Sequence, residues 1–159
     1  RIKNELPGFK IIFIGSGPML EAYQSIIKTY CMEDLVSFEG MKKLDECMVY
    51  MLESDVLVQP SVTALNGDSE GGAPTILIEA QIVGIPVIGS THADIPFVMG
   101  YDDFLAEEGD VDDLSRVIRS SFRHDLISEK IEAGRRKASE QHDMNISNTY
   151  CNILLEFFR

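Results

Sequence analysis

FKIIFIGSGPMLEAYQSIIKTY, residues 9–30, is the stretch that decides the fold class of this chain. It begins with an apolar, β-branched and aromatic run that ends at Gly15, and such a run predicts a buried strand. After Pro18, apolar residues recur at three- and four-residue spacing, which is typical of a helix packed on a sheet. The stretch therefore predicts one strand, a glycine-containing loop and one helix.

The same alternation continues along the rest of the sequence. Further strands are expected at residues 35–38, 56–58 and 86–89, with a small segment at 103–106, and helices at 19–32, 44–52, 75–83, 111–122, 127–141 and 146–158. Strands that alternate with helices predict a Rossmann-like, three-layer α/β/α fold around a parallel sheet. Because such sheets bind ligands outside the carboxyl ends of their strands, the loops after residues 14, 38, 58 and 88 are expected to share one edge.

Length and charge limit the function classes. A chain of 159 residues has the size of one domain, so residues 1–159 are expected to form a single domain. Its net charge of -12 disfavours nucleic acid and anionic lipid surfaces as partners. No apolar run approaches the roughly 20 residues that a membrane span needs.

The cysteines indicate a reducing compartment. Cys31, Cys47 and Cys151 are odd in number, far apart in the sequence and without any CxxC pairing. This pattern predicts neither a disulfide framework nor a zinc site. A cytoplasmic protein is the expectation that fits best.

The first loop, Gly15-Ser-Gly17-Pro18, can bring the backbone close to a ligand. Its two glycines permit a tight turn, and the proline suits the first turn of a helix. Leu20 stands where a dinucleotide fingerprint would place its third glycine, so that motif is absent. A tight turn between a strand and a helix, without any ligand, explains the same residues.

The segment GDSEGGAPTILIEA, residues 67–80, predicts an anion site. Glycines and a proline precede an apolar helix, so unpaired backbone N–H groups and the positive end of the helix should face the sheet edge. A diphosphate suits such a helix end without a basic side chain nearby. The candidate ligand-binding residues here are Gly71, Gly72, Pro74, Thr75 and Ile76.

Glu79 interrupts this apolar helix four residues after Thr75, so the two share one face. An ionised carboxylate among apolar residues is costly unless it is paired, and ribose hydroxyls are suitable donors to it. Alternatively, Glu79 points to water or to a neighbouring backbone amide.

Two further candidates lie later in the sequence. His92, in the loop after residues 86–89, either binds phosphate or sugar or is simply exposed. Asp110-Val-Asp112 resembles a metal-binding DxD, but its place at a helix start favours capping, so no metal is expected.

Several motifs occur in an order that closely resembles the family 4 retaining glycosyltransferases. The match comprises IGSGP at 14–18, VSFEG at 36–40, SDVLVQPS at 54–61 and the series EG, P, EA, GIPVIGS and IP within residues 70–96. Together these motifs cover most of residues 9–98. The segment STHADIP at 90–96 resembles the corresponding sequence in a branch of the family that makes bacterial surface or exported polysaccharides.

The resemblance implies that the chain is the C-terminal, donor-binding half of a GT-B glycosyltransferase. It implies that Glu79 holds the ribose of a nucleoside-diphosphate sugar and that Glu70 contacts the sugar as the catalytic residue. Because their loops are expected at the same edge, Gly15, Gly17 and His92 are further candidates for donor binding. The sugar would pass with retention to a glycan or lipid-linked acceptor, without a cofactor. The acceptor-binding N-terminal domain is absent from this sequence, so the chain alone is expected to be inactive. The whole enzyme would be cytoplasmic, and possible contact with the inner membrane face would be peripheral.

Two departures from the family pattern stand out. One extra residue lies between Glu70 and Glu79, which predicts a local bulge at 71–73. The strand that normally opens this half carries an arginine and a lysine that neutralise the diphosphate, and it is not recognised before Phe9. No motif assigns Arg1 or Lys3 to those roles.

Two alternative functions remain. One is a sugar-nucleotide epimerase of the same fold, and the other is a non-catalytic nucleotide-binding module on a flavodoxin-like sheet.

Overall fold

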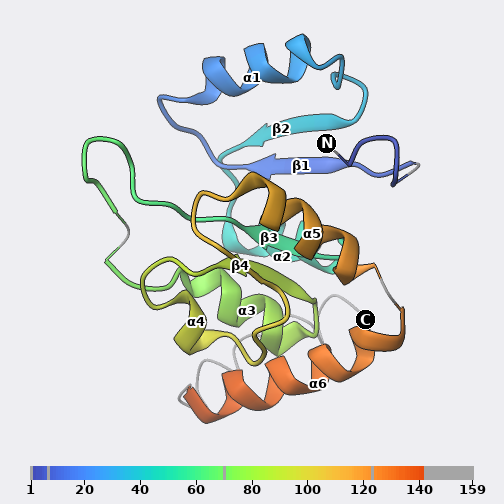
Figure 1. Cartoon of the computed structure of the whole chain (residues 1–159), viewed down its shortest axis with the longest axis vertical. Helices are drawn as coiled ribbons and strands as arrows, with labels where there is room; N and C mark the ends of the chain where they lie inside the picture. Colours follow the sequence, from blue (N-terminus) through green and yellow to red (C-terminus); the bar gives the residue numbers. More distant parts are fainter. Residues whose placement is uncertain (1, 7, 70, 123, 142–159) are drawn as a thin grey trace. The chain divides into compact units, whose positions relative to one another are not determined.

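A computed structural model describes residues 2–6, 8–69, 71–122 and 124–141 of the chain, with side chains given for all of these except 124–126 and 141 (Figure 1). The chain divides into two compact units, Arg1–Tyr50 and Met51–Arg159. Each unit is described by itself below. The single domain expected over residues 1–159 stays a prediction.

The first unit contains a parallel pair of strands and a helix. Its elements are β1 (Ile11–Ile14), α1 (Leu20–Thr29) and β2 (Val36–Gly40), and α2 (Leu44–Leu52) follows across the boundary between the units. Ile11 pairs with Val36, and the register shifts between Phe13 and Ile14. The Phe13 ring stacks on Phe38 at 5.0 Å and on Tyr23 of α1 at 6.3 Å, so aromatic contacts hold α1 to the strand pair.

The prediction that residues 9–15 form a buried strand is correct for the strand and wrong for the burial. All four residues of β1 are exposed, and the side chain of Ile12 retains 43% of its accessible surface. In the part of the chain that the structure describes, β1 pairs along one edge with β2, and α1 has no buried residue. An apolar sequence predicts that a strand can be buried, but burial itself requires neighbours on both faces.

The second unit is built on a three-stranded parallel sheet of order β3-β4-β5. Its elements are β3 (Leu57–Gln59), α3 (Thr75–Val83), β4 (Val87–Ser90), α4 (Ile95–Val98), β5 (Leu105–Ala106), α5 (Val111–Ser121) and α6 (His124–Gln141). α3 contacts β3 and β4, whereas α5 contacts β4 and β5, and α6 packs on α3, α4 and α5. The predicted alternation of strands and helices is therefore confirmed.

The structure adds one short helix to the predicted elements and confirms a predicted cap. The turn α4 was not expected, because four residues are too few to show a periodicity. Asp110 caps α5 as predicted, since its carboxylate accepts hydrogen bonds from the amides of Asp112 and Asp113. The helix expected at 146–158 lies outside the described residues.

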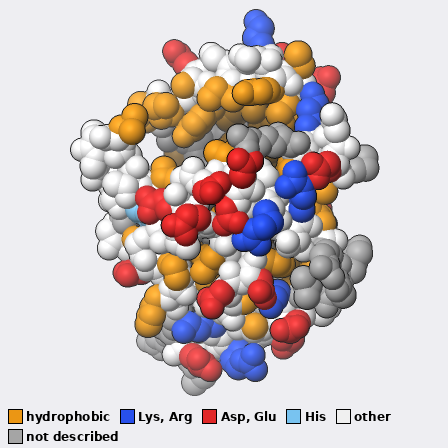
Figure 2. Space-filling view, in the orientation of Figure 1, with side chains coloured by type: hydrophobic (Ala, Val, Ile, Leu, Met, Phe, Trp, Pro, Cys, Tyr) orange, Lys and Arg blue, Asp and Glu red, His pale blue; other side chains and the backbone are white. Residues whose placement is uncertain are grey.

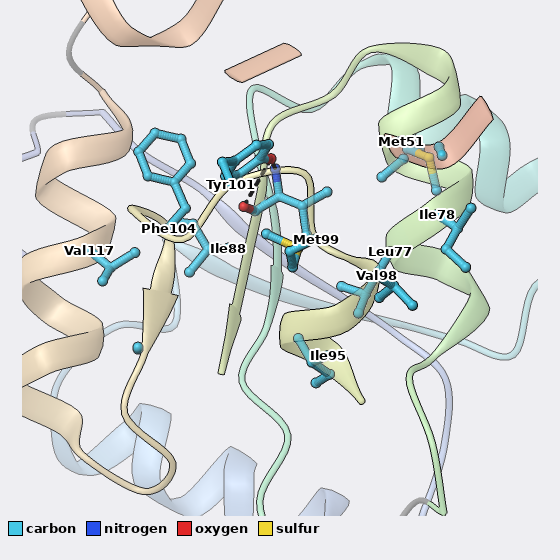
Figure 3. Packing of buried hydrophobic residues seen from close by; sticks show 14 residues of the cluster. Met51, Leu77, Ile78, Ile88, Ile95, Val98, Met99, Tyr101, Phe104 and Val117 are labelled. Carbon is cyan, nitrogen blue, oxygen red and sulfur yellow. Dashed lines mark hydrogen bonds between the residues drawn. The ribbon is translucent and has the colours of Figure 1, made fainter. Parts of the chain in front are cut away.

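The hydrophobic core of the second unit lies on both sides of its sheet (Figure 3). Val117 of α5 and Leu77 of α3 approach the strands from opposite sides in Figure 3. The fully buried apolar side chains of this core include Leu77, Val87, Ile88, Ile95, Phe104 and Val117. Gly84 ends α3 in the left-handed conformation, with φ of 86°, which glycine adopts without strain.

Tyr101 links this core to β4 through its hydroxyl. The Val87 N–H donates to the Tyr101 oxygen at 2.8 Å, and the hydroxyl donates to the Val87 carbonyl at 3.2 Å (Figure 3). Burial raises the pKa of Tyr101 from its ordinary value of 10.0 to about 12. The neutral hydroxyl is therefore the form that stabilises the fold.

Tyr101→Phe is expected to lower the free energy of unfolding by about 1–3 kcal/mol at pH 7, because the buried Val87 N–H loses its acceptor. Since the folded pKa is raised, the wild-type advantage is complete below the unfolded pKa of 10.0 and is lost as the pH rises toward about 12. Urea unfolding at pH 7, 9 and 10.5 should show the gap between the two proteins narrowing only at the highest pH. Tyr30→Phe, at an exposed position, is the matched control. A gap that is absent at pH 7 would contradict the assignment.

Candidate functional site

The carboxyl ends of the three strands of the second unit meet at one edge of its sheet. Hydrogen bonds join the loops that follow these strands: the Ser90 hydroxyl donates to the Ser61 carbonyl at 2.6 Å, and the Thr91 N–H donates to the Ala106 carbonyl at 2.9 Å. Because β3, β4 and β5 run parallel, residues far apart in the sequence lie together here. The predicted shared edge is confirmed for the loops after residues 58 and 88.

α3 begins at this edge with an open N-terminus. The helix starts at Thr75, as predicted, and Pro74 is its N-cap with φ of −58° and ψ of 131°. Pro74 contributes its carbonyl, which accepts from the Leu77 N–H at 3.1 Å, and its side chain has no atom that could cap an amide. Thr75 is exposed and Ile76 is half-buried. Thr75 thus places the start of α3 at the surface, and the N-terminal end of a helix favours an anion.

Glu79 lies one turn beyond Thr75 on the same face of α3. Its neighbours in the sequence, Ile78 and Ala80, are buried, with exposed fractions of 9% and 0%. Glu79 itself is half-buried, so its carboxylate belongs to the less covered stripe of the helix. This position suits a carboxylate that accepts hydrogen bonds from a ligand at the N-terminal end of the helix.

The glycines before α3 leave room at the edge. Gly71 is exposed, and a side chain at that position would meet no atom within 4 Å. A Cβ at Gly72 would lie 3.7 Å from Oδ2 of Asp94, which places this residue beside the loop after β4. Glu70, the predicted catalytic residue, lies outside the described residues, and the bulge expected at 71–73 stays a prediction.

Gly15 and Gly17 lie in the first unit, in the loop after β1. Gly15 has φ of 124°, a conformation that side-chain-bearing residues rarely adopt, and its N–H donates to the Gly40 carbonyl at 2.8 Å. No atom would lie within 4 Å of a Cβ at either glycine. The loop therefore makes a turn that requires glycine at position 15, and its role in ligand binding stays a prediction.

His92 is buried, with an exposed fraction of 2%, so the interpretation that it is simply an exposed loop residue is wrong. Its Nε2 lies 3.1 Å from the Ser69 hydroxyl, and its Nδ1 lies 3.1 Å from Oε1 of Glu108. The distance between Nδ1 and Oε1 is that of an ion pair, but the contact does not have the geometry of a hydrogen bond. Sequence reasoning missed Ser69 and Glu108, because only strand order brings their loops to the same edge.

Glu108 is held firmly at this edge. Its carboxylate accepts from the Thr63 N–H at 2.6 Å, and its own N–H donates to the Thr91 hydroxyl at 2.9 Å. The Thr63 amide is the main cause that lowers the pKa of Glu108, and His92 contributes in the same direction. An ionised carboxylate therefore lies against the buried imidazole at neutral pH.

Charge around the site is mainly negative. Acidic side chains gather in the middle of the face shown in Figure 2. Separately, the segment 107–113 of the second unit contains five acidic residues. The basic side chain of Lys3, in the first unit, donates to the Cys31 carbonyl at 2.7 Å near the end of α1. A helix N-terminus can bind phosphate without a basic side chain nearby.

Comparison with known proteins gives a consistent result. The sequence model of the family described as glycosyl transferases group 1 matches residues 1–138. The putative colanic acid biosynthesis glycosyltransferase WcaL of Escherichia coli K12 is 32% identical over 98% of this chain, and the amylovoran biosynthesis glycosyltransferase AmsK of Erwinia amylovora is likewise 32% identical over 98%. The chain spans 39% of the length of each of these relatives.

Solved structures show the same fold. Sucrose-phosphate synthase of Thermosynechococcus elongatus has a TM-score of 0.73 at 19% identity and covers 97% of this chain, which corresponds to 40% of that protein. Anabaena HepE, solved in complex with UDP-glucose, has a TM-score of 0.71 at 20% identity, covering 95% of this chain and 42% of that protein. The predicted Rossmann-like α/β fold of GT-B glycosyltransferases is confirmed. Among the described residues, no helix has the length and apolarity to cross a membrane.

Proposed function

We propose, from the premise that this chain belongs to the group 1 glycosyl transferase family, that it binds the nucleoside-diphosphate sugar of a glycosyltransferase that acts in surface polysaccharide biosynthesis. The observation that carries this proposal is the exposed N-terminus of α3 at the carboxyl edge of the sheet, with Glu79 one turn along the same face. A diphosphate would take the amides near Thr75, and the ribose hydroxyls would donate to Glu79. The UDP-glucose complex of HepE, which has a similar fold, supports a sugar nucleotide as the ligand.

In the transfer step, the dipoles of this edge would stabilise the departing diphosphate. Charge develops on its oxygens as the bond to the sugar breaks, and preorganised N–H groups stabilise that charge without having to reorient. Gly71 and Gly72 would let backbone amides approach the donor, and Glu70 would contact the sugar. We propose that the sugar passes with retention to a glycan or lipid-linked acceptor. We place this acceptor on a separate N-terminal domain, since the chain spans 39% of the length of its relatives.

We propose that no metal ion takes part. In the DxD-like pair, Oδ1 of Asp110 accepts hydrogen bonds from two amides of α5, which supports a capping role for this carboxylate. Phosphate binding at a helix N-terminus needs no metal. Chelators should therefore leave donor binding unchanged.

A thermal-shift panel tests this proposal. Uridine, guanosine and adenosine diphosphates and their sugars should be compared on the purified chain, with and without EDTA. One nucleotide series is expected to raise the melting temperature in a concentration-dependent way, since a ligand that binds only the folded state stabilises it, and EDTA should change nothing. The same samples should show no sugar transfer. A panel in which no nucleotide stabilises the chain would refute donor binding, and sugar released from its nucleotide would favour an epimerase-like activity.

A further inference from the structure

His92 connects all three loops at the carboxyl edge of the second unit. The residue itself follows β4, its Nε2 contacts Ser69 in the loop before α3, and its Nδ1 lies against Glu108 after β5, each at 3.1 Å. Its side chain is almost fully buried, whereas Ser69 is exposed. One buried ring thus reaches the surface loop that leads into α3.

The burial of this imidazole indicates a specific role. Removing a polar ring from water costs free energy unless its nitrogens find partners, and a loop can usually leave a histidine in solvent at no cost. Glu108 is ionised at neutral pH and fixed by the Thr63 and Thr91 contacts, and its negative charge 3.1 Å from Nδ1 favours the tautomer of a neutral ring that carries its proton on Nδ1. Nε2 is then an acceptor for the Ser69 hydroxyl.

We infer that His92 is a positioning residue, which acts through Ser69 to hold residues 61–69 against the sheet edge in a conformation ready for the sugar nucleotide. The inference rests on the proposed function and differs from direct contact between His92 and phosphate or sugar. The held segment has its own turn, in which the Ala64 N–H donates to the Asp68 carbonyl and the Gly67 N–H donates to the Ala64 carbonyl, both at 2.8 Å. Holding a loop in its bound conformation improves affinity because less ordering is needed on binding.

Ser69→Ala removes the exposed partner of the hydrogen bond between His92 and Ser69 and so tests this link. The free variant should melt at the wild-type temperature, because an exposed hydroxyl contributes little to global stability. Its dissociation constant for the sugar nucleotide selected by the panel should rise about tenfold by calorimetry, since the loop must then be ordered on binding. Hydrogen exchange at the amides of Ala64 and Gly67 should become faster in the absence of ligand. Ser128→Ala, at an exposed position on α6, is the matched control.

Two variants of His92 separate positioning from mere filling of space. Glutamine places its amide near the Nε2 position and can still bond Ser69, whereas asparagine places its amide near Nδ1 and cannot reach Ser69. His92→Gln is therefore expected to keep affinity within about threefold of wild type, and His92→Asn to match Ser69→Ala. Adding Ser69→Ala to His92→Asn should cause no further loss, because both remove the same link.

Three outcomes decide the inference. If Ser69→Ala binds the sugar nucleotide as wild type does and its amides exchange at the wild-type rate, the inference is overturned while donor binding stands. Equal losses in the glutamine and asparagine variants overturn it as well, because a packing role predicts that pattern. If the wild-type chain binds no sugar nucleotide, the proposed function fails instead, and the exchange rates still decide whether His92 holds the loop.

Discussion

Replacing Glu79 by alanine is expected to weaken sugar-nucleotide binding by about 10- to 150-fold, the equivalent of roughly 1.5–3 kcal/mol for hydrogen bonds to a charged group. The reason is that two neighbouring ribose hydroxyls would lose a common carboxylate acceptor. The free variant should melt near the wild-type temperature, because alanine is a good helix former and Glu79 is only half-buried. Calorimetric titration with the nucleotide series selected by the panel measures the loss.

The ligand can be varied to show where the carboxylate acts. A 2′,3′-dideoxy analogue should bind the wild-type chain as weakly as the natural nucleotide binds Glu79→Ala. Combining the analogue with the variant should cost nothing more, because both changes remove the same contact. Glu53→Ala removes an exposed carboxylate in the turn after α2 and serves as the control. If Glu79→Ala bound the nucleotide within twofold of wild type, Glu79 would have no role at the ribose.

Leu77→Ala is expected to lower the free energy of unfolding by about 2.7–5 kcal/mol, the range for a buried leucine that leaves a cavity. Leu77 has no exposed surface and lies in the first turn of α3, where it packs into the core of the second unit (Figure 3). The same loss should loosen the N-terminus of α3. Urea unfolding followed by circular dichroism measures the change in stability.

Leu65→Ala is the matched control for this prediction, because Leu65 is fully exposed and the same atoms are removed. The control should change stability by less than about 0.5 kcal/mol. The amides at the start of α3 should exchange faster in Leu77→Ala and at the wild-type rate in Leu65→Ala. Equal stability losses in the two variants would show that the core does not hold α3 as described.

The elements of this chain were largely predictable from local pattern. The predicted helices at 44–52 and 75–83 coincide with α2 and α3, because their apolar spacing and the residues that flank them act within a few positions. The Asp110 cap was predictable for the same reason, since a capping carboxylate bonds amides two and three residues along the chain. The short turn α4 was not predictable, because one helical turn carries no period.

The candidate site was predictable only in part. The glycines before α3, Thr75 and Glu79 were found because a helix N-terminus and a lone carboxylate are visible within one segment. The buried state of His92 was not, because Ser69 and Glu108 are 23 residues before it and 16 residues after it in the chain. Similarly, the composition of β1 did not reveal that its side chains remain exposed in the described structure.

The sequence by itself determined the alternation of strands and longer helices, the family, and the place of the helix end that begins at Thr75. These follow from interactions between residues a few positions apart, which leave periodic and compositional patterns. Only the tertiary structure decided which side chains are buried and that one histidine contacts the loops of two other strands. Such contacts depend on strand order and on the packing of distant segments, for which no local pattern exists.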